Sequence, residues 1–329
     1  MICKSAYPLI AALFLATWTA SVAEPGDRLS LHTRRRVEIS PGSGVYRVVE
    51  ETRGWDAKRT AIVICDMWDQ HWCKGASRRV AEMAPRINQV VQEARKRGVL
   101  IIHAPSDTMK FYEGTPEREL ARAAPEVAPK TPLLRWCNLD PQREAPLPID
   151  DSDGGCDDTP QCKTGLAWTR QIKTIQIQPG DAVTDSAEAY YLLQQRGIEN
   201  LIVMGVHLNM CVLGRPFSVR QMLNQGKNVL VMRDLTDTMY NSRKRPYVSH
   251  FAGTDLMIEH VEKYLCPTIT SVDFGAHEPF RFSEDTRGQP QTIPPPAHQS
   301  HPASFAVVPF APPVPLAYLG SRLAMTRAR

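Results

Sequence analysis

The strongest constraint on the fold is a set of short, continuously apolar runs that each end in polar residues. The four clearest runs are residues 60–65, 99–102, 201–206 and 228–232. A run of this length without polar alternation is typical of a strand that is buried on both faces of a parallel sheet. Helical periodicity separates these runs at residues 76–97 and 185–196, and a glycine closes each of the two helical segments.

This alternation of strands and helices predicts the fold class. Further strands are expected at residues 171–178 and 268–272, and a further helix is expected at about 249–264. Strands that alternate with helices imply a parallel sheet that is covered on both sides. We therefore predict an α/β protein, a three-layer α/β/α sandwich with a mainly parallel sheet of about six strands and a Rossmann-like topology.

Polar side chains gather where the predicted strands end. The residues at or just past the carboxyl ends are Asp66, His103, Gln178, His207 and Asp234. Sheets of this kind bind ligands at that edge, so the sequence predicts a site there. Cys211 follows the strand at 201–206, where a helix is expected to begin, and a helix start favours the nucleophilic thiolate. The alternative is a buried, inert cysteine, because free Cys is among the most buried residue types.

The N-terminus has the pattern of a signal peptide over residues 1–23. Lys4 supplies the positive start, residues 9–16 the apolar stretch, and residues 21–23 a cleavage site of small residues. We expect cleavage there and export to the periplasm or the extracellular space. No later stretch reaches 18 apolar residues, so no stable membrane span is expected in the mature chain.

Composition divides the rest of the chain into segments. Residues 24–57 alternate like two strands around Pro41-Gly-Ser-Gly44, which predicts an N-terminal hairpin extension. Residues 58–275 carry the predicted α/β domain. Within it, residues 125–170 form a long irregular segment that we interpret as a loop or lid over the site. The Pro-rich tail, residues 280–329, is expected to be disordered.

Charge and cysteine usage narrow the classes of function. The chain has 329 residues and a net charge of +4, and the basic runs 34–36 and 243–245 contain no aromatic residues. We interpret these runs as solvated faces, so no nucleic-acid partner is expected. Seven cysteines follow residue 23, which leaves at least one free thiol in an exported protein. Cys137, Cys156 and Cys162 lie in one loop-like region, where a disulfide is expected.

Three stretches resemble the isochorismatase-like cysteine hydrolases, a family that includes isochorismatases, nicotinamidases and N-carbamoyl-amide hydrolases. They are Ile62-Val-Ile-Cys-Asp-Met-Trp68, the run from Leu192 to Gly205, and Asn209-Met-Cys-Val212. The resemblance covers about residues 58–272. The segment Gly205-Val-His-Leu-Asn-Met-Cys-Val-Leu-Gly-Arg-Pro-Phe217 is also similar to an exported subgroup of that family.

The resemblance implies a catalytic triad of Asp, Lys and Cys. Asp66 matches the aspartate, which takes the thiol proton and later acts as an acid, and Cys211 matches the nucleophile that forms a thioester. The implied oxyanion hole consists of backbone N–H groups, which by position belong to His207 and Cys211. A cis peptide bond often precedes this turn in the family, and by position it would be Val206–His207.

The triad lysine has no match in this sequence. Counting back from Gly197, the implied position is Gln178, and residues 178–184 contain no Lys, Arg or His. Without a cation the Asp66–Cys211 pair loses electrostatic support for a thiolate and for the developing oxyanion. Lys74 is close in sequence to the first strand and is a candidate replacement.

The nicotinamidase branch of the family suggests a metal site. Asp69-Gln-His71 has an Asp-x-His spacing, and His103 follows the second strand, so Asp69, His71 and His103 are weak candidate zinc ligands. The family's own Asp-x-His lies further along the chain, and we expect no cofactor. The alternative is that these residues are hydrogen-bonded residues of the pocket.

The leading hypothesis is a hydrolase that cleaves a C–N, amide-like bond of a small-molecule substrate through a Cys211 thioester. The alternatives are an exported binding protein that kept the pocket but lost the lysine, and a metal-assisted hydrolase. The resemblance also makes a homo-oligomer a candidate state. Candidate substrate-binding residues are His71, Trp72, Lys74, His103, Asp107, Tyr112, Asn209 and Arg215. Arg215 could clamp a carboxylate in two contacts or pair with an acid at a helix end.

Overall fold

A computed structural model describes residues 28–288 of the chain. The chain divides into two units, Met1–Asp285 and Thr286–Arg329, and every element named below lies in the first. The expected signal peptide lies outside the described residues, as does the expected tail from residue 289 onward. Residues 280–285 belong to the folded unit, where the ring of Phe282 stacks on Phe251.

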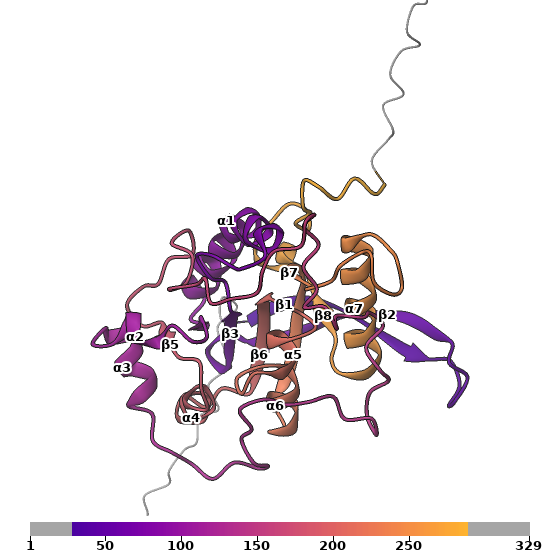
Figure 1. Cartoon of the computed structure of the whole chain (residues 1–329). Helices are drawn as coiled ribbons and strands as arrows, with labels where there is room; N and C mark the ends of the chain where they lie inside the picture. The colour runs from indigo at the N-terminus through magenta and orange to yellow at the C-terminus, as the bar shows by residue number, and fades with distance from the viewer. Residues whose placement is uncertain (1–27, 289–329) are drawn as a thin grey trace, which may run out of the picture. The chain divides into compact units, whose positions relative to one another are not determined.

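Eight strands form one sheet in the order β2-β1-β8-β7-β6-β3-β4-β5 (Figure 1). The strands are β1 (Arg28–Glu38), β2 (Tyr46–Asp56), β3 (Thr60–Cys65), β4 (Leu100–Ala104), β5 (Ala182–Val183), β6 (Asn200–Val206), β7 (Asn228–Asp237) and β8 (Thr268–Ile269). The six strands from β3 to β8 are parallel, and β1 and β2 add an antiparallel hairpin next to β8. The predicted α/β class with a mainly parallel sheet is confirmed, with eight strands rather than about six.

Helices cover both faces of the sheet. The α-helices are α1 (Lys74–Lys96), α2 (Met109–Tyr112), α3 (Pro116–Arg122), α4 (Glu188–Gln195), α5 (Cys211–Gly214), α6 (Val219–Asn224) and α7 (His250–Tyr264). Two 3₁₀ turns are η2 (Ala57–Arg59) and η3 (Ser271–Phe274). In Figure 1, α1 lies on one side of the central strands, and α4, α5 and α6 lie on the other. No described helix has the combined length and apolarity that crossing a membrane requires.

The side chains of β3 show how the sequence builds these layers. Ile62 and Ile64 point into an apolar cluster with Met83 of α1, while Val63 joins a second cluster with Leu192 of α4. Successive side chains of a strand point to opposite faces, so a continuously apolar strand buries residues on both. The three layers follow directly from that pattern.

The strand predicted at residues 171–178, in the segment between α3 and β5, does not form. Residues 171–178 are not a strand: Gln171 forms one isolated bridge with Trp68, and Ile175 is buried from a turn. The third parallel strand is instead β5, which has only two residues and pairs with β4. Ile175 is buried in the core and Ile172 packs against it, so this stretch contributes apolar side chains without forming a strand.

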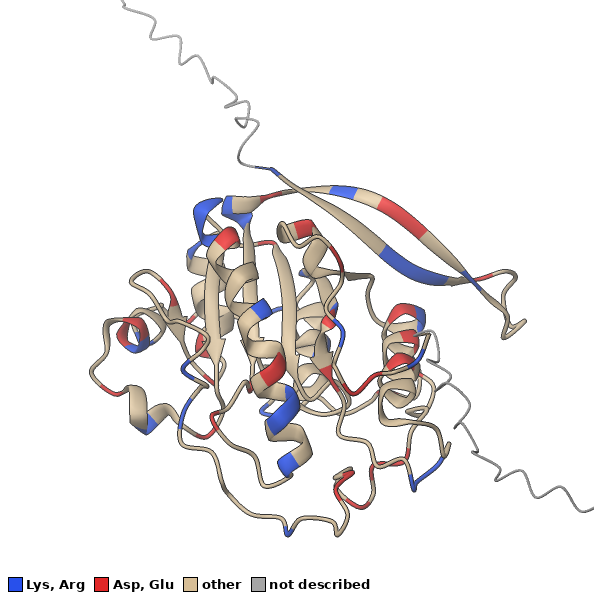
Figure 2. Ribbon diagram, turned by 90° about the horizontal axis from the view of Figure 1, so that it is seen from above, with Lys and Arg blue, Asp and Glu red and all other residues tan. Residues whose placement is uncertain are grey.

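The hairpin of β1 and β2 carries charges of both signs along its length (Figure 2). Its arginines pair with acids rather than standing alone: Arg34 Nε lies 2.8 Å from Glu262, and Arg36 contacts Glu259 and Glu262 at 3.2 Å. The Glu262 carboxylate, on α7, is fully buried, and the Arg34 and Arg36 side chains are 28% and 21% exposed. The basic run 34–36, which we interpreted as a solvated face, is therefore partly neutralised by a buried acid.

Gly205 allows β6 to approach β3 closely. Its φ is +107°, and a Cβ atom built there would overlap the carbonyl oxygen of Cys65. The register between β6 and β7 also shifts between Val203 and Gly205. Only glycine fits a position that combines positive φ with this backbone approach.

Replacing Gly205 by alanine is therefore expected to lower the free energy of unfolding by about 3 kcal/mol or more, because strain and overlap add. Gly197→Ala is the matched control, since Gly197 also has positive φ (+61°) but has no atom within 4 Å of the added Cβ. It should cost only about 1 kcal/mol. Urea unfolding of both variants measures the difference, and equal losses would contradict the close approach of β6 to β3.

Candidate active site

Asp66 directly follows β3 and is fully buried. Its φ is +49°, a left-handed conformation that is uncommon for a residue with a side chain. The Ser106 backbone N–H donates to Asp66 Oδ1 at 2.7 Å, while Oδ2 is buried without a hydrogen-bond partner among the described residues. A buried carboxylate oxygen that accepts no hydrogen bond has a free-energy cost, and such groups in native structures often have a functional explanation.

Cys211 begins α5, one turn beyond the end of β6, and is 9% exposed. β6 pairs with β3 along its whole length, with Gly205 opposite Cys65. The adjacent carboxyl ends therefore bring Asp66 and Cys211 together, and each group shifts the pKa of the other. The short turn between the strand and the cysteine thus sets the position of the thiol.

Arg215 is the cation of this site. It follows α5, one helical turn after Cys211, and its Nε lies 3.7 Å from Asp66 Oδ2. The guanidinium also lies over the ring of Trp136, 5.8 Å from its centroid, and its Nη2 donates to Asp107 at 3.2 Å. From the sequence, Arg215 was either a carboxylate clamp or the partner of an acid at a helix end, and the structure pairs it with an acid, Asp66. Its spacing of four residues from Cys211 was the signal that could have placed it beside the thiol.

The long segment 125–170 helps to place this arginine. The Cys137 N–H donates to the Gly214 carbonyl at 2.7 Å, and Trp136 packs so closely that a Cβ on Gly214 would come within 2.6 Å of its ring. Trp136 then supports the Arg215 guanidinium from one side. A segment distant in sequence therefore closes over α5 and fixes the cation.

The electrostatics of the three groups favour a resting thiol rather than a thiolate. Burial, followed by the Asp66 charge, raises the pKa of Cys211 well above its usual value, and Arg215 opposes this. The expectation that a helix start favours the thiolate is wrong here, because α5 has a single turn and burial outweighs its dipole. Burial also raises the pKa of Asp66 to about 6, with Arg215 acting to lower it.

Two backbone N–H groups stand at either end of the turn between β6 and α5, those of His207 and Cys211. The Val206–His207 peptide bond is cis, as the family resemblance implies. The N–H groups of His207 and Cys211 form no hydrogen bond with any residue in the range 28–288. Unpaired N–H groups beside a nucleophile can stabilise a negatively charged oxygen.

Neither Gln178 nor Lys74, the two positions considered for the triad cation, places a positive charge beside Asp66 and Cys211. Gln178 is exposed, precedes β5 by four residues and uses its N–H to bind Asp181 Oδ2 at 2.8 Å. The assignment of Gln178 to the end of the third strand was wrong because that strand lies later in the chain. Lys74 is exposed at the first position of α1 and is not among the groups that shift the pKa of Asp66 or Cys211.

The candidate zinc ligands do not come together. His103 is fully buried between Gln171 and Asp181, with contacts of 2.9 and 3.0 Å to its two ring nitrogens. Asp69 accepts from Thr169 on the far end of the long segment. Among the described residues, the metal-type cluster that forms is a different one, at Cys73, Cys156 and Asp158. The proposed Asp69, His71 and His103 site therefore does not fit zinc.

Several candidate pocket residues hold the long segment in place. The Tyr112 hydroxyl accepts from the Gln171 N–H, and the Asn209 amide donates to Asp151 at 2.7 Å. Trp72 is half-buried and packs on Gly154. These contacts give the three residues positioning roles around the site.

Three aromatic rings, those of Trp68, His71 and Trp168, lie between Asp66 and the His207 turn along the chain or in contact with that turn, and we call them the aromatic wall. Trp68 and Trp168 stack at 4.3 Å, and His71 stacks on Trp168 at 5.5 Å. His71 also meets His207 edge-on at 5.0 Å. Burial lowers the pKa of His71 to about 4, so its ring is neutral at pH 7. The wall is therefore an uncharged stack of rings next to the His207 turn, in which Trp68 is buried and His71 and Trp168 are partly exposed.

No family model matches this chain, and no curated protein matches it in sequence. Solved structures do match, among them a cysteine hydrolase from Pseudomonas syringae pv. phaseolicola with 15% identity, a TM-score of 0.42, and coverage of 67% of this chain and 92% of that one. An isochorismatase from Pseudomonas putida has 14% identity, a TM-score of 0.40, and coverage of 66% and 91%.

An N-carbamoylsarcosine amidase from Thermoplasma acidophilum also matches, with 13% identity, a TM-score of 0.35, and coverage of 65% of this chain and 96% of that one. These structures belong to the family that the sequence resembles. Identities of this size carry no residue's role from one chain to the other, so the roles below are argued from the site itself.

Proposed function

We propose that this chain is an isochorismatase-like cysteine hydrolase that cleaves a C–N, amide-like bond of a small molecule. The observation that carries the proposal is the convergence of Asp66, Cys211 and Arg215 at the carboxyl edge of the sheet. A nucleophile, a base near it and a cation beside both are the parts that acyl transfer needs. Arg215 takes the place of the lysine that the sequence lacks.

In the first half of the reaction Asp66 acts as base. The Cys211 proton passes to Asp66 as the sulfur attacks the substrate carbonyl carbon, and Arg215 stabilises the charge on the thiolate. The carbonyl oxygen becomes an oxyanion that the N–H groups of His207 and Cys211 stabilise. The C–N bond then breaks, Asp66 returns its proton to the leaving nitrogen, and a thioester on Cys211 remains.

In the second half water hydrolyses the thioester. Asp66, again a carboxylate, takes a proton from the attacking water, and the same two N–H groups stabilise the second oxyanion. The C–S bond breaks and the proton returns to the Cys211 sulfur, which releases a carboxylic acid and restores the resting site. A pKa of about 6 suits Asp66 to accept and return a proton near neutral pH.

The surroundings favour a small, flat substrate. Cys211 is only 9% exposed, and the aromatic wall of Trp68, His71 and Trp168 offers an uncharged stacking surface. We further propose that the chain acts after export, as its N-terminal residues suggest. An exported binding protein without chemistry is less well supported, because the loss of the family lysine was its basis and Arg215 supplies a cation.

The rate should depend on pH through Asp66. Because the base must be deprotonated to accept the thiol proton, kcat/KM is expected to be flat at neutral pH and to fall tenfold per pH unit below about pH 6. Initial rates between pH 4 and 8, on a panel of primary amides and N-carbamoyl compounds, measure this fall in rate on the acid side, the acid limb of the pH profile.

Asp66→Asn should remove the acid limb together with most of the activity, because an amide cannot take the proton. Asp234→Asn is the control, since Asp234 is a partly buried aspartate that binds Ser271, away from the site. An Asp66→Asn variant with full turnover would exclude Asp66 as the base. Substrate binding without any turnover in the unmodified chain would favour the binding-protein alternative.

A further inference from the structure

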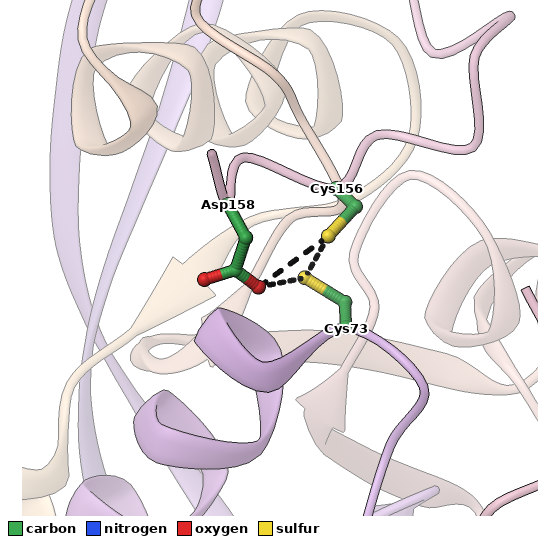
Figure 3. Close-up of side chains that lie close together, drawn as sticks. All are labelled: Cys73, Cys156 and Asp158. Carbon is green, nitrogen blue, oxygen red and sulfur yellow. Dashed lines mark hydrogen bonds between the residues drawn. The ribbon is translucent and has the colours of Figure 1, made fainter. Parts of the chain in front are cut away.

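A cluster of two thiols and a carboxylate lies outside the site described above. Figure 3 shows the Cys73 sulfur, at the start of α1, pointing toward the sulfur of Cys156 and the carboxylate of Asp158 in the long segment. The two sulfurs are 2.6 Å apart although they are 83 positions apart in the chain. Both cysteines are fully buried and are present as free thiols.

Asp158 anchors this cluster. Its Oδ2 accepts from the Gly75 N–H at 2.8 Å and lies 3.4 Å from Cys73 Sγ and 3.5 Å from Cys156 Sγ. Cys162, which is partly exposed, has its sulfur 3.4 Å from the same oxygen. Burial raises the pKa of Cys73, and the Cys156 thiol and the Asp157 charge add to the rise, so thiolate formation at Cys73 is opposed.

A zinc ion fits this arrangement poorly. Among the described residues, only the ligand atoms of Cys73, Cys156 and Asp158 all lie within 4.8 Å of one another; the Cys162 sulfur, although 3.4 Å from Asp158, is outside that set, and structural zinc is held by four ligands. Two thiolates bound to one zinc in tetrahedral geometry would stand about 3.8 Å apart. Zinc ligation would also require buried thiolates beside the negative Asp158, whereas an uncharged S–S bond would not.

We propose that Cys73 and Cys156 form a disulfide that clamps the long segment to the start of α1. Two thiols are oxidised, each losing one proton and one electron, and one disulfide of an external oxidant such as oxidised glutathione is reduced to two thiols. An S–S bond joins Cys73 and Cys156. One cysteine first forms a mixed disulfide with the oxidant and releases one thiol of the oxidant. The other cysteine then attacks this mixed disulfide and releases the second thiol of the oxidant.

The clamp would hold segments that touch the active site. Cys73 lies two residues after His71 of the aromatic wall, and Cys156 lies in the stretch whose Asp151 binds Asn209 in the turn before Cys211. The neighbouring Asp157 forms a buried pair with Arg79 of α1 at 2.9 Å. The bond would therefore fix the segment against α1 on the side where that segment meets the nucleophile's turn.

The test is thiol mapping on the full chain, refolded from urea in a glutathione redox buffer and, in parallel, under full reduction. After acid quenching, denaturation and alkylation, peptide mass spectrometry should find a linked Cys73–Cys156 pair and two fewer alkylated cysteines than in the reduced chain. Oxidation should also raise the melting temperature by roughly 5–10 °C. Both effects should vanish in Cys156→Ser and persist in Cys137→Ser.

Two results would overturn the proposal. One is complete alkylation of Cys73 and Cys156 in the oxidised chain, or a link from either of them to Cys162 instead. The other is one equivalent of zinc, measured by metal analysis of chain refolded with zinc chloride, that is lost in Cys73→Ser. Because none of these measurements uses turnover, a failed clamp remains distinguishable from a failed hydrolase assignment.

Discussion

Replacing Cys211 by alanine is expected to lower kcat/KM roughly 10⁴-fold or more, because no other group can form the thioester. Of the two cysteines that the described residues place beside Asp66 and Arg215, Cys211 is 9% exposed, whereas Cys65 is fully buried. In the unmodified chain, rapid acid quenching during turnover should trap an acyl group on the Cys211 peptide, detectable by mass spectrometry. In Cys211→Ala that adduct should be absent, while substrate binding remains measurable by calorimetry.

The matched control for this experiment is Cys266→Ala. Cys266 is also a buried cysteine in the same apolar cluster, but it lies after α7 and does not contact the three site groups. It should lose stability without losing the adduct. If Cys211→Ala kept its turnover, or if the adduct formed on another cysteine, the thioester mechanism would be wrong for this protein.

Cys65 is a second buried cysteine that lies directly beside this site, so an adduct on Cys211 must be distinguished from one on Cys65. It precedes Asp66, and burial followed by the Asp66 charge raises its pKa well above the usual value. It is fully buried on β3, so a substrate carbonyl cannot reach its sulfur. Mapping the adduct to a peptide that contains Cys211 but not Cys65 therefore matters for interpreting the trapped species.

The sheet could be predicted because its central strands appear in the sequence as continuous apolar runs. The runs at 60–65 and 201–206 correspond to β3 and β6 almost residue for residue, since a strand buried on both faces tolerates no polar interruption. The helix predicted at 249–264 is α7, and the one at 76–97 is α1. The edge strand β5 was missed because two residues cannot carry a periodic signal.

The candidate site was only half predictable, for a physical reason. Asp66 and Cys211 follow strands, so their meeting depends on topology that the apolar runs already imply. The cation depends on side-chain packing between distant segments. Trp136 reaches Arg215 from a loop with no periodicity, and only the fold shows that the guanidinium turns toward Asp66.

The absence of the family lysine then has a simple electrostatic interpretation. A buried carboxylate and a thiol need one nearby positive charge, and the strand from which it comes is of no consequence to the field it produces. Here the charge comes from Arg215, one helical turn after Cys211. An arginine remains charged even when buried, whereas a lysine loses its proton more readily in the same surroundings.

Replacing Arg215 by methionine is expected to lower kcat/KM roughly 10²–10³-fold, the loss typical of removing one charge-stabilising group. It should also move the acid limb of the pH profile above pH 6. The sign follows from Coulomb attraction: Arg215 holds the pKa of Asp66 down against burial, so its removal lets that pKa rise. Rates of the variant and the unmodified chain between pH 5 and 9 measure both effects.

Arg215→Lys separates charge from shape, because it keeps the cation and loses the planar contacts to Asp107 and Trp136. It should retain more activity than the methionine variant and keep its acid limb near pH 6. Arg196→Met, which removes an exposed arginine after α4, controls for net charge and should change neither quantity. A methionine variant that lost activity with an unmoved acid limb would show that Arg215 only supports the fold, since a merely structural arginine has no means of shifting the titration of Asp66.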